Sequence, residues 1–408
     1  MTAEVALEFK ASDGLAMRGA FTKSIASDTW VWTFLALINA AALSCLFLKG
    51  YWLIGKDGHP LVHDYLAFWA AGKRIYADQA ALLYDWNIQS QYEAQLVGTA
   101  APIELYILYP PHFLFTITAF AWLPYLPASL LFLLVSIAGY SLSLRLIVGD
   151  WQKAAIISIA GGGAFYCLWW VQNGFLTAAL LSAGVALLGS QPILAGIFLG
   201  LLTIKPQLGL LIPIALLASR NWRTITSATC TFLSVALAAE LYLGTGMWAR
   251  FIESLFEASE FLGGGNLWFK QQSLFAIMLP MLGTKTAWAV HIAFALLVGV
   301  IVFDLWRREG DIWAKSGALI SASLLVSPYL YPYDAVSLTA AAAMILYRTD
   351  SRLSAGERLA AFTCCVLPMG ARVLFSAAVP LAALGLLFLS LRISSRISEA
   401  TPENAAIS

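Results

Sequence analysis

Charged residues are scarce in this chain. Asp, Glu, Lys and Arg make up 12% of its 408 residues, whereas about 25% is usual in soluble domains. The net charge is +1 and no cluster of Lys and Arg occurs, which argues against a nucleic-acid partner, because such proteins neutralise phosphates with clustered cations. Hydrophobic residues make up 60%. The composition therefore predicts an all-α polytopic membrane protein.

Motifs for soluble-cofactor chemistry are also missing. The chain has no Walker loop, dinucleotide-binding fingerprint or nucleophile elbow. Its five cysteines lie in apolar tracts without a metal-ligand spacing, so we interpret them as small core residues. They are Cys45, Cys167, Cys230, Cys364 and Cys365.

Histidines near Asp64 offer only a weak metal site. His59 and His63 would share a face of a helix, but Pro60 makes a continuous helix through them unfavourable. His112 follows much later in the chain. We therefore expect neither a metal nor a cofactor.

Residues 1–28 contain several acidic residues among the cations, and the first apolar run is longer than the core of a signal peptide. We interpret residues 1–28 as a cytoplasmic arm and residues 396–408 as a polar cytoplasmic tail. A single transmembrane domain, 29–395, lies between them.

Apolar tracts predict about twelve transmembrane helices, since about 20 helical residues cross a bilayer. Lys and Arg between the tracts place both termini in the cytoplasm. The predicted spans are 30–48, 128–148, 154–170, 175–188, 193–204, 208–218, 224–243, 287–306, 317–330, 335–347, 359–369 and 373–391.

Two larger loops are predicted on the outer, periplasmic face. Residues 50–125 mix aromatic and charged residues, which is typical of interfacial helices. Within them, 112–123 is too short to span and is interpreted as re-entrant or interfacial. The second loop, 244–272, has helical apolar spacing over part of its length, and a separate apolar piece, 273–282, follows it.

The spans 193–204 and 208–218 are unusually short and meet at Lys205-Pro206-Gln207. Broken helices at membrane depth line cavities and indicate binding sites. Lys205 is therefore a candidate for binding a lipid phosphate, although a lysine snorkelling to the interface is the ordinary alternative. Arg372 is a weaker candidate of the same kind. Gly161-Gly162-Gly163, in another span, permits close helix approach.

Asp64 begins the segment HDYLAFWAAGKRIYADQAALLYD between two apolar tracts. A partly desolvated carboxylate at a membrane surface is suited to act as a general base. The alternative is an N-cap for the following amphipathic helix.

Other polar residues fall on the same predicted face. Gln172 and Asn173 form an outer turn, and Asp334 lies beside Tyr331 and Tyr333. Aromatic rings with a carboxylate are typical of sugar sites, but an interfacial aromatic belt with a solvated acid is an equal alternative.

Several segments together resemble glycosyltransferase family 87, whose members are polyprenol-phosphate-sugar-dependent enzymes of the GT-C superfamily. The segments are DYLAFWAAG with LLYD, YPP with WLPY, QNGFLTAALL, AGIFLGLLTIKPQLGLL and SPYLYPYDAV. The resemblance implies a GT-C-like fold and a bacterial inner-membrane enzyme. Such an enzyme transfers a sugar, often mannose, from a polyprenyl-phosphate carrier to a lipid or glycan acceptor on the periplasmic side.

The resemblance also implies that the first outer loop supplies an essential aspartate, and Asp64 occupies that motif. Lys205 and Gln207 stand in the family's K-P-Q motif. One departure is Tyr333-Asp334, where some mannosyltransferases of the family have two histidines, so the sugar and the acceptor stay open.

The expected site then has Asp64 as base in an inverting single displacement and cations at the lipid phosphate. Its residues are Asp64, Lys205 and Arg372, with Gln172, Asn173, Gln207, Tyr331, Tyr333 and Asp334 at the substrate. Two alternatives stay open: a transporter or lipid flippase, which also uses broken helices, and a non-catalytic subunit of an envelope-polymer assembly.

Overall fold

A computed structural model describes residues 28–99, 101, 103, 105, 107–263, 270–349 and 353–400. Side chains are described in these ranges except at 258–263 and 397–400. The predicted arm 1–28, apart from its last residue, and most of the predicted tail 396–408 lie outside the described residues.

Helices account for the regular structure, as predicted from composition. The described part of the chain forms no strand, only isolated bridges near residue 54. Within the described ranges, five helical stretches are long and apolar enough to cross a membrane. They are Asp28–Leu48, α5 (Tyr125–Val148), α11 (Trp222–Leu243), α13 (Leu274–Arg307) and Phe375–Arg396, which includes most of α17 (Ala378–Ala400).

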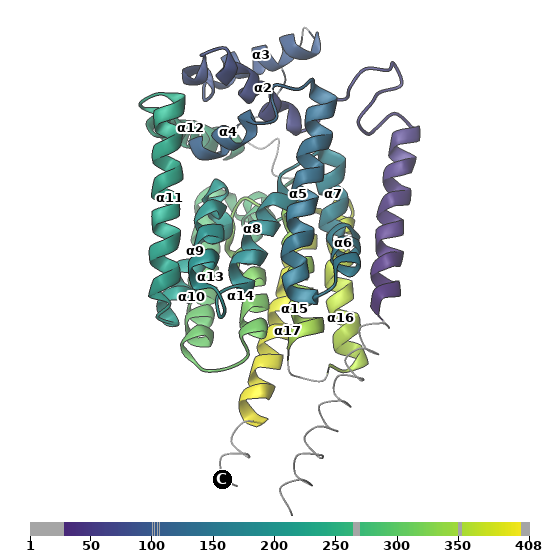
Figure 1. Ribbon diagram of the computed structural model, residues 1–408, viewed down its shortest axis with the longest axis vertical. Helices are drawn as coiled ribbons and strands as arrows, with labels where there is room; N and C mark the ends of the chain where they lie inside the picture. The colour runs from purple at the N-terminus through teal and green to yellow at the C-terminus, as the bar shows by residue number, and fades with distance from the viewer. Residues whose placement is uncertain are drawn as a thin grey trace, which may run out of the picture.

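Shorter helices complete the bundle, with α9 and α10 beside α11 and with α8, α14 and α15 nearer its centre (Figure 1). Their bounds are α8 (Gly174–Ala186), α9 (Pro192–Leu201), α10 (Ile212–Ala218), α14 (Ile312–Val326), α15 (Val336–Arg348) and α16 (Ala355–Val366). In α14 and α15 nearly every residue is buried, so these two helices form the core. They are the elements that hold the polar site described below.

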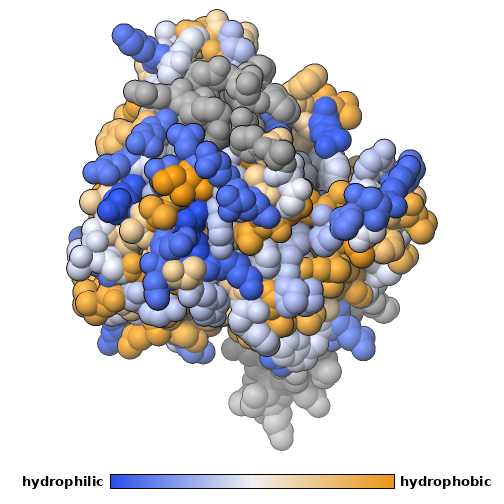
Figure 2. All heavy atoms as spheres, turned by 90° about the horizontal axis from the view of Figure 1, so that it is seen from above, coloured by the Kyte–Doolittle hydropathy of each residue, from blue (hydrophilic) through white to orange (hydrophobic). Residues whose placement is uncertain are grey.

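A cap of helices lies at the end of the molecule opposite Asp28 and the end of α17 (Figure 1). It contains α2 (Tyr65–Tyr76), the short η1 (Ala80–Leu82), α3 (Trp86–Val97), α4 (Pro111–Thr118) and α12 (Met247–Gly263). Figure 2 shows hydrophilic side chains gathered on this face and hydrophobic ones around its rim. The helices expected in the two outer loops are therefore present.

The tract 154–170 differs from its prediction as one span. It forms α6 (Trp151–Ala160) and α7 (Gly162–Trp170), because Gly161 has an extended backbone. The carbonyls freed by the break are satisfied by Asn39, whose Nδ2 donates to Ile159 O at 2.8 Å and to Gly161 O at 3.0 Å. Such a break is tolerated in an apolar bundle because another helix supplies the missing donors.

The tracts 273–282 and 287–306 were predicted as separate pieces, and they are the two helical parts of α13 on either side of a kink. The change of direction between them is a kink at Gly283, whose φ is +72°. Pro280 lies just before it within the helix. Glycine adopts this left-handed conformation without strain, so the two tracts join through one bend.

The first helix is fixed to the last third of the chain. Trp32 Nε1 donates to Tyr347 OH at 2.7 Å, and its ring lies 4.9 Å from that of Phe362. Asp28 pairs with Arg358. These contacts join residues that are more than 300 positions apart.

Close backbone approaches hold the short helix η5 (Pro332–Ala335) between α14 and α15. A Cβ on Gly163 would lie 2.4 Å from Val336 N and 2.5 Å from Ala335 C. A Cβ on Gly174 would lie 2.2 Å from Tyr333 O. The glycine run at the start of α7 thus permits close packing, as expected. Gly163 packs against both η5 and the start of α15.

We predict that Gly163→Ala destabilises the fold. The new methyl group would meet backbone atoms that cannot rotate away, and such overpacking typically costs about 1–3 kcal/mol. The matched control is Gly139→Ala in α5, where the nearest atom is Ala179 Cβ at 3.9 Å. Thermal unfolding in detergent should show a lower Tm for Gly163→Ala alone, and equal Tm values would contradict the packing argument.

Candidate functional site

Four breaks in the helical structure meet at the predicted site. Asp64 precedes α2, and Gln172 and Asn173 lie between α7 and α8. Lys205 lies between η2 (Leu202–Ile204) and η3 (Pro206–Gly209), and Asp334 lies in η5. Residues that are far apart in sequence therefore form one polar cluster inside an apolar protein.

A buried ion pair lies at the centre of this cluster. Lys205 Nζ contacts Asp334 Oδ1 at 2.5 Å, and the two side chains are 5% and 0% exposed. The second carboxylate oxygen of Asp334 accepts a hydrogen bond of 2.9 Å from Tyr331 N. Lys205 is therefore not snorkelling to an interface, and Asp334 is not a solvated acid of an aromatic belt.

Aromatic rings surround the ammonium group. The rings of Tyr331 and Tyr333 stack at 5.4 Å with 11° between their planes. Lys205 Nζ lies 4.7 Å from the Tyr333 ring centroid and 5.9 Å from that of Tyr109. At these distances the ring faces attract the cation, so the lysine has both ionic and aromatic stabilisation.

The backbone of Asp64 is helical, and its side chain makes no capping hydrogen bond to α2. Its carboxylate instead accepts a 3.3 Å hydrogen bond from Gln172 Nε2. Asp64 is partly exposed, but the protein around it desolvates the charge and raises its pKa above the usual value. The hydrogen bond from Gln172 and the charges of Lys270 and Lys205 oppose that shift.

Gln172 connects Asp64 to the ion pair. Its Nε2 also donates to Tyr333 OH at 3.3 Å, and its Oε1 accepts from Asn173 N at 2.8 Å and from Tyr109 OH at 3.5 Å. Tyr333 in turn lies against Lys205. A continuous network therefore runs from the partly exposed carboxylate to the buried pair.

Asn173 is fully buried beside Tyr109. Neither polar atom of its side chain has a hydrogen-bond partner of normal geometry within the described residues. A buried amide without a partner is uncommon in proteins. Asn173 is therefore one of the polar side chains that are buried inside the cluster.

Two of the predicted site residues, Gln207 and Arg372, lie at the margin of the polar cluster. Gln207 is half-buried in η3, two residues after Lys205. Arg372 is exposed and lies 4.5 Å over the ring of Trp169. No recorded contact within the described ranges joins Arg372 to Lys205 or Asp334, so the structure does not bring Arg372 into the cluster.

The histidines considered as metal ligands lie in separate places. His63 Nε2 accepts from Leu53 N at 3.2 Å. His112 Nε2 lies 3.2 Å from Thr203 Oγ1, and its ring stacks on Trp248. Each therefore has a structural partner of its own.

Sequence reasoning missed three residues of the cluster. Tyr109 was considered only within the YPP segment and was given no role, although it lies against Lys205 and Gln172. Lys270 acts on the Asp64 charge, and the buried Gln271 interacts with Tyr331. For Lys270 and Gln271, the sequence signal was their position beside other polar residues in the segment WFKQQS.

We predict that Lys205→Met strongly destabilises the protein. It leaves the Asp334 carboxylate buried without its cation, and breaking such a pair typically costs about 3–5 kcal/mol. The double variant Lys205→Met/Asp334→Asn removes the unpaired charge and should recover part of the loss. Thermal unfolding of the purified variants in detergent measures both effects, and a double variant no more stable than the single one would contradict the buried-charge explanation.

Comparison with known proteins adds one positive finding. The model of glycosyltransferase family 87 matches residues 106–328, which is more than half of the chain. This range includes Tyr109, Gln172 and Lys205, whereas Asp334 lies shortly after it and Asp64 lies well before it. No curated protein and no solved structure was found to match. The family match supports the enzyme interpretation over the transporter interpretation, and this helical membrane chain belongs to glycosyltransferase family 87.

Proposed function

We propose that this enzyme transfers a hexose, with mannose as the first candidate, from a polyprenyl-phosphate carrier to a lipid or glycan acceptor. The reaction is an inverting single displacement at the periplasmic face of a bacterial inner membrane. The sugar-carrying lipid is a co-substrate, and the proposal requires neither a cofactor nor a metal.

The arrangement of Asp64 is the observation that carries this proposal. Its carboxylate is not used to cap α2 and belongs to the network that ends at Lys205 and Asp334. An acid with a raised pKa and a nearby cation are the groups that displacement from a phosphate requires, since one accepts a proton and the other stabilises the leaving group.

In the proposed step, Asp64 accepts the proton of an acceptor hydroxyl group. The hydroxyl oxygen forms a bond to the anomeric carbon of the sugar from the face opposite the phosphate. The bond between that carbon and the phosphate oxygen breaks, and its electron pair leaves with the lipid phosphate. The product therefore has the opposite anomeric configuration, and the proton stays on Asp64 until solvent removes it.

Lys205 is proposed to bind the lipid phosphate, and Arg372 is a second, outlying cation. Because Asp334 pairs with Lys205, an arriving phosphate competes with this carboxylate for the ammonium group. Tyr331 and Tyr333 offer ring faces and hydroxyl groups to the sugar, and Gln172, Asn173 and Gln207 offer amides. These roles fit the residue types and their placement.

A GT-C architecture with twelve membrane crossings is part of the proposal. A helix or helix pair corresponds to each predicted span, and Asp28 and the end of α17 lie at the same end of the molecule (Figure 1). Both termini are then cytoplasmic, and the cap of α2, α3, α4 and α12 faces the periplasm.

We predict that Asp64→Asn abolishes transfer while the protein stays folded. Loss of a general base typically lowers the rate about 10²–10⁴-fold. The assay follows the transfer of labelled sugar from a synthetic polyprenyl-phosphate hexose to membrane lipids and glycans. The configuration of the product, determined by NMR, tests the inverting step.

The control for Asp64 is Asp85→Asn in the same loop. Asp85 caps α3 by accepting from Ile88 N at 3.0 Å, and asparagine is an equally good cap. This variant should therefore keep its activity. Full activity of Asp64→Asn would falsify the assignment of the base.

We predict that the transfer rate falls on the acid side of its pH profile, the acid limb, at a pH above the range in which aspartate side chains usually titrate. Asp64 is active as the carboxylate, so activity is present above its raised pKa and is lost as pH falls through it. Gln172→Leu removes a hydrogen bond that lowers this pKa, so the limb should move to higher pH. The exposed Gln95 supplies the control variant Gln95→Leu, and an unmoved limb in Gln172→Leu would contradict the link.

A further inference from the structure

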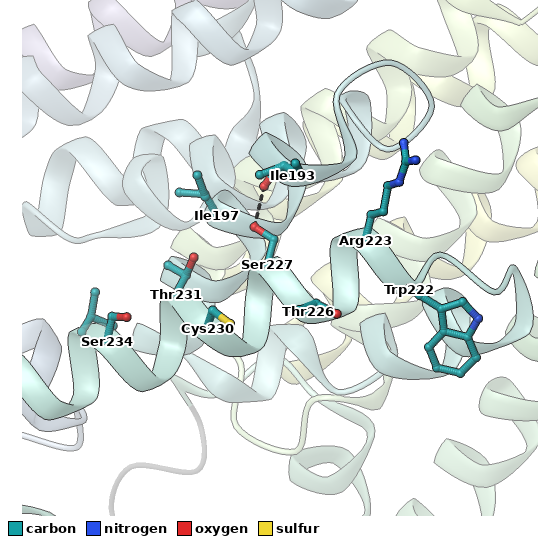
Figure 3. A pocket seen from close by; sticks show the side chains of 10 residues that line it. Ile193, Ile197, Trp222, Arg223, Thr226, Ser227, Cys230, Thr231 and Ser234 are labelled. Atoms are coloured by element: carbon teal, nitrogen blue, oxygen red, sulfur yellow. Dashed lines mark hydrogen bonds between the residues drawn. The ribbon is translucent and has the colours of Figure 1, made fainter.

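A groove lies outside the catalytic cluster, on the surface formed by α9 and α11 (Figure 3). Its volume is about 780 Å³. Its lining comes from two helices that are long or apolar enough to lie in the membrane. The lining residues are Ile193 and Ile197 of α9 and Trp222, Arg223, Thr226, Ser227, Cys230, Thr231, Ser234 and Val235 of α11.

Small side chains make the groove. Ser227, Cys230 and Ser234 follow one another along α11, as Figure 3 shows. Ser227 Oγ donates to Ile193 O at 2.7 Å, so its hydroxyl group is satisfied within the protein. Cys230 is exposed in the groove, as Cys45 is on the first helix, which corrects the prediction that all five cysteines are core residues. The result is a largely apolar channel open to the surrounding lipid.

Arg223 lies at one end of the groove, in the first turn of α11 (Figure 3). It is exposed and forms no ion pair within the described ranges. A cation at a helix N-terminus is unfavourable, because the helix dipole already places partial positive charge there. A bound anion would compensate both the guanidinium group and the helix end.

A second hollow of about 400 Å³ adjoins the groove beside the same arginine. It shares Ile193, Ile197 and Arg223 with the groove, and Gln191, Pro192 and Leu194 line it alone. Two adjoining apolar hollows with a cation beside them suit a phosphate group with two hydrocarbon chains.

We propose that these two hollows bind an anionic phospholipid, with its phosphate at Arg223 and one acyl chain in each hollow. The site lies at the end of α11 remote from the cap (Figure 1). The exposed Trp222 is of the type that anchors proteins at the membrane surface. A lipid of the leaflet on the side remote from the cap therefore reaches it.

The bound lipid supports the helix that leads to Lys205. α9 continues through η2 to this lysine. A Cβ on Gly196 would lie 2.5 Å from Ser227 Cβ, and a Cβ on Gly200 would lie 2.6 Å from Ala228 O. α9 is therefore in close contact with α11 on one side, and the acyl chains complete its packing on the open side.

Native mass spectrometry of the purified full-length chain tests the proposal. Delipidated protein in detergent is titrated with phosphatidylglycerol or phosphatidylcholine. We expect tighter binding of phosphatidylglycerol, and a reduction of about fivefold in its affinity in Arg223→Gln, since one basic residue contributes about 1 kcal/mol at an anionic surface. The matched control is Arg220→Gln, because Arg220 is exposed three residues earlier but lines neither hollow.

Cys230 gives an independent measure of occupancy. In a Cys45→Ser background, Cys230 is exposed and the remaining cysteines are buried. The rate of maleimide labelling therefore reports on the groove. Phosphatidylglycerol should slow labelling in the parent and the Arg220→Gln variant, and inorganic phosphate should not. Equal lipid binding by Arg223→Gln and Arg220→Gln, protection by inorganic phosphate alone, or a Cys230 cross-link between two copies would each overturn the proposal.

Discussion

The buried contact between Lys205 and Asp334 is the interaction on which the site depends. Moving two charges out of water is costly, and their attraction offsets that cost only when the geometry is good and the remaining polar atoms are satisfied. Here the carboxylate also accepts from Tyr331 N, and the ammonium group lies against tyrosine rings. The surrounding backbone must therefore be held closely in place.

Glycines provide that constraint. Gly163 and Gly174 lie so close to the backbone of η5 that no side chain fits between them, which fixes Asp334 against α7 and α8. Gln172, at the junction of the same two helices, then connects Tyr333 to Asp64. The partly exposed acid and the buried pair are therefore positioned by one set of packing contacts, which suits a site whose two ends act on the same bond.

Composition, apolar tract length and proline positions predicted much of this architecture, because these signals are local. The break at Lys205-Pro206 was visible for that reason, whereas the break at Gly161 was not. Its freed carbonyls are satisfied by Asn39, 120 or more positions away. Residue type likewise identified Asp64, Lys205 and Asp334 as unusual, but the pairing of the last two spans 129 positions and leaves no local pattern. The family resemblance contributed the role of Asp64, because the sequence pattern alone favoured an N-cap there.

The contacts of the first helix bear on how the protein is made. Asp28 and Trp32 find their partners on helices that are synthesised more than 300 residues later. Asn39 donates to the carbonyl of Gly161, which is synthesised before those partners, so the first helix joins the bundle in stages. At chain elongation rates of about 5–20 residues per second, the half of the helix that contains Asp28 and Trp32 waits on the order of 15 s or more beside the insertion machinery. Chains that lack the C-terminal helices should therefore leave this helix accessible to membrane quality-control proteases.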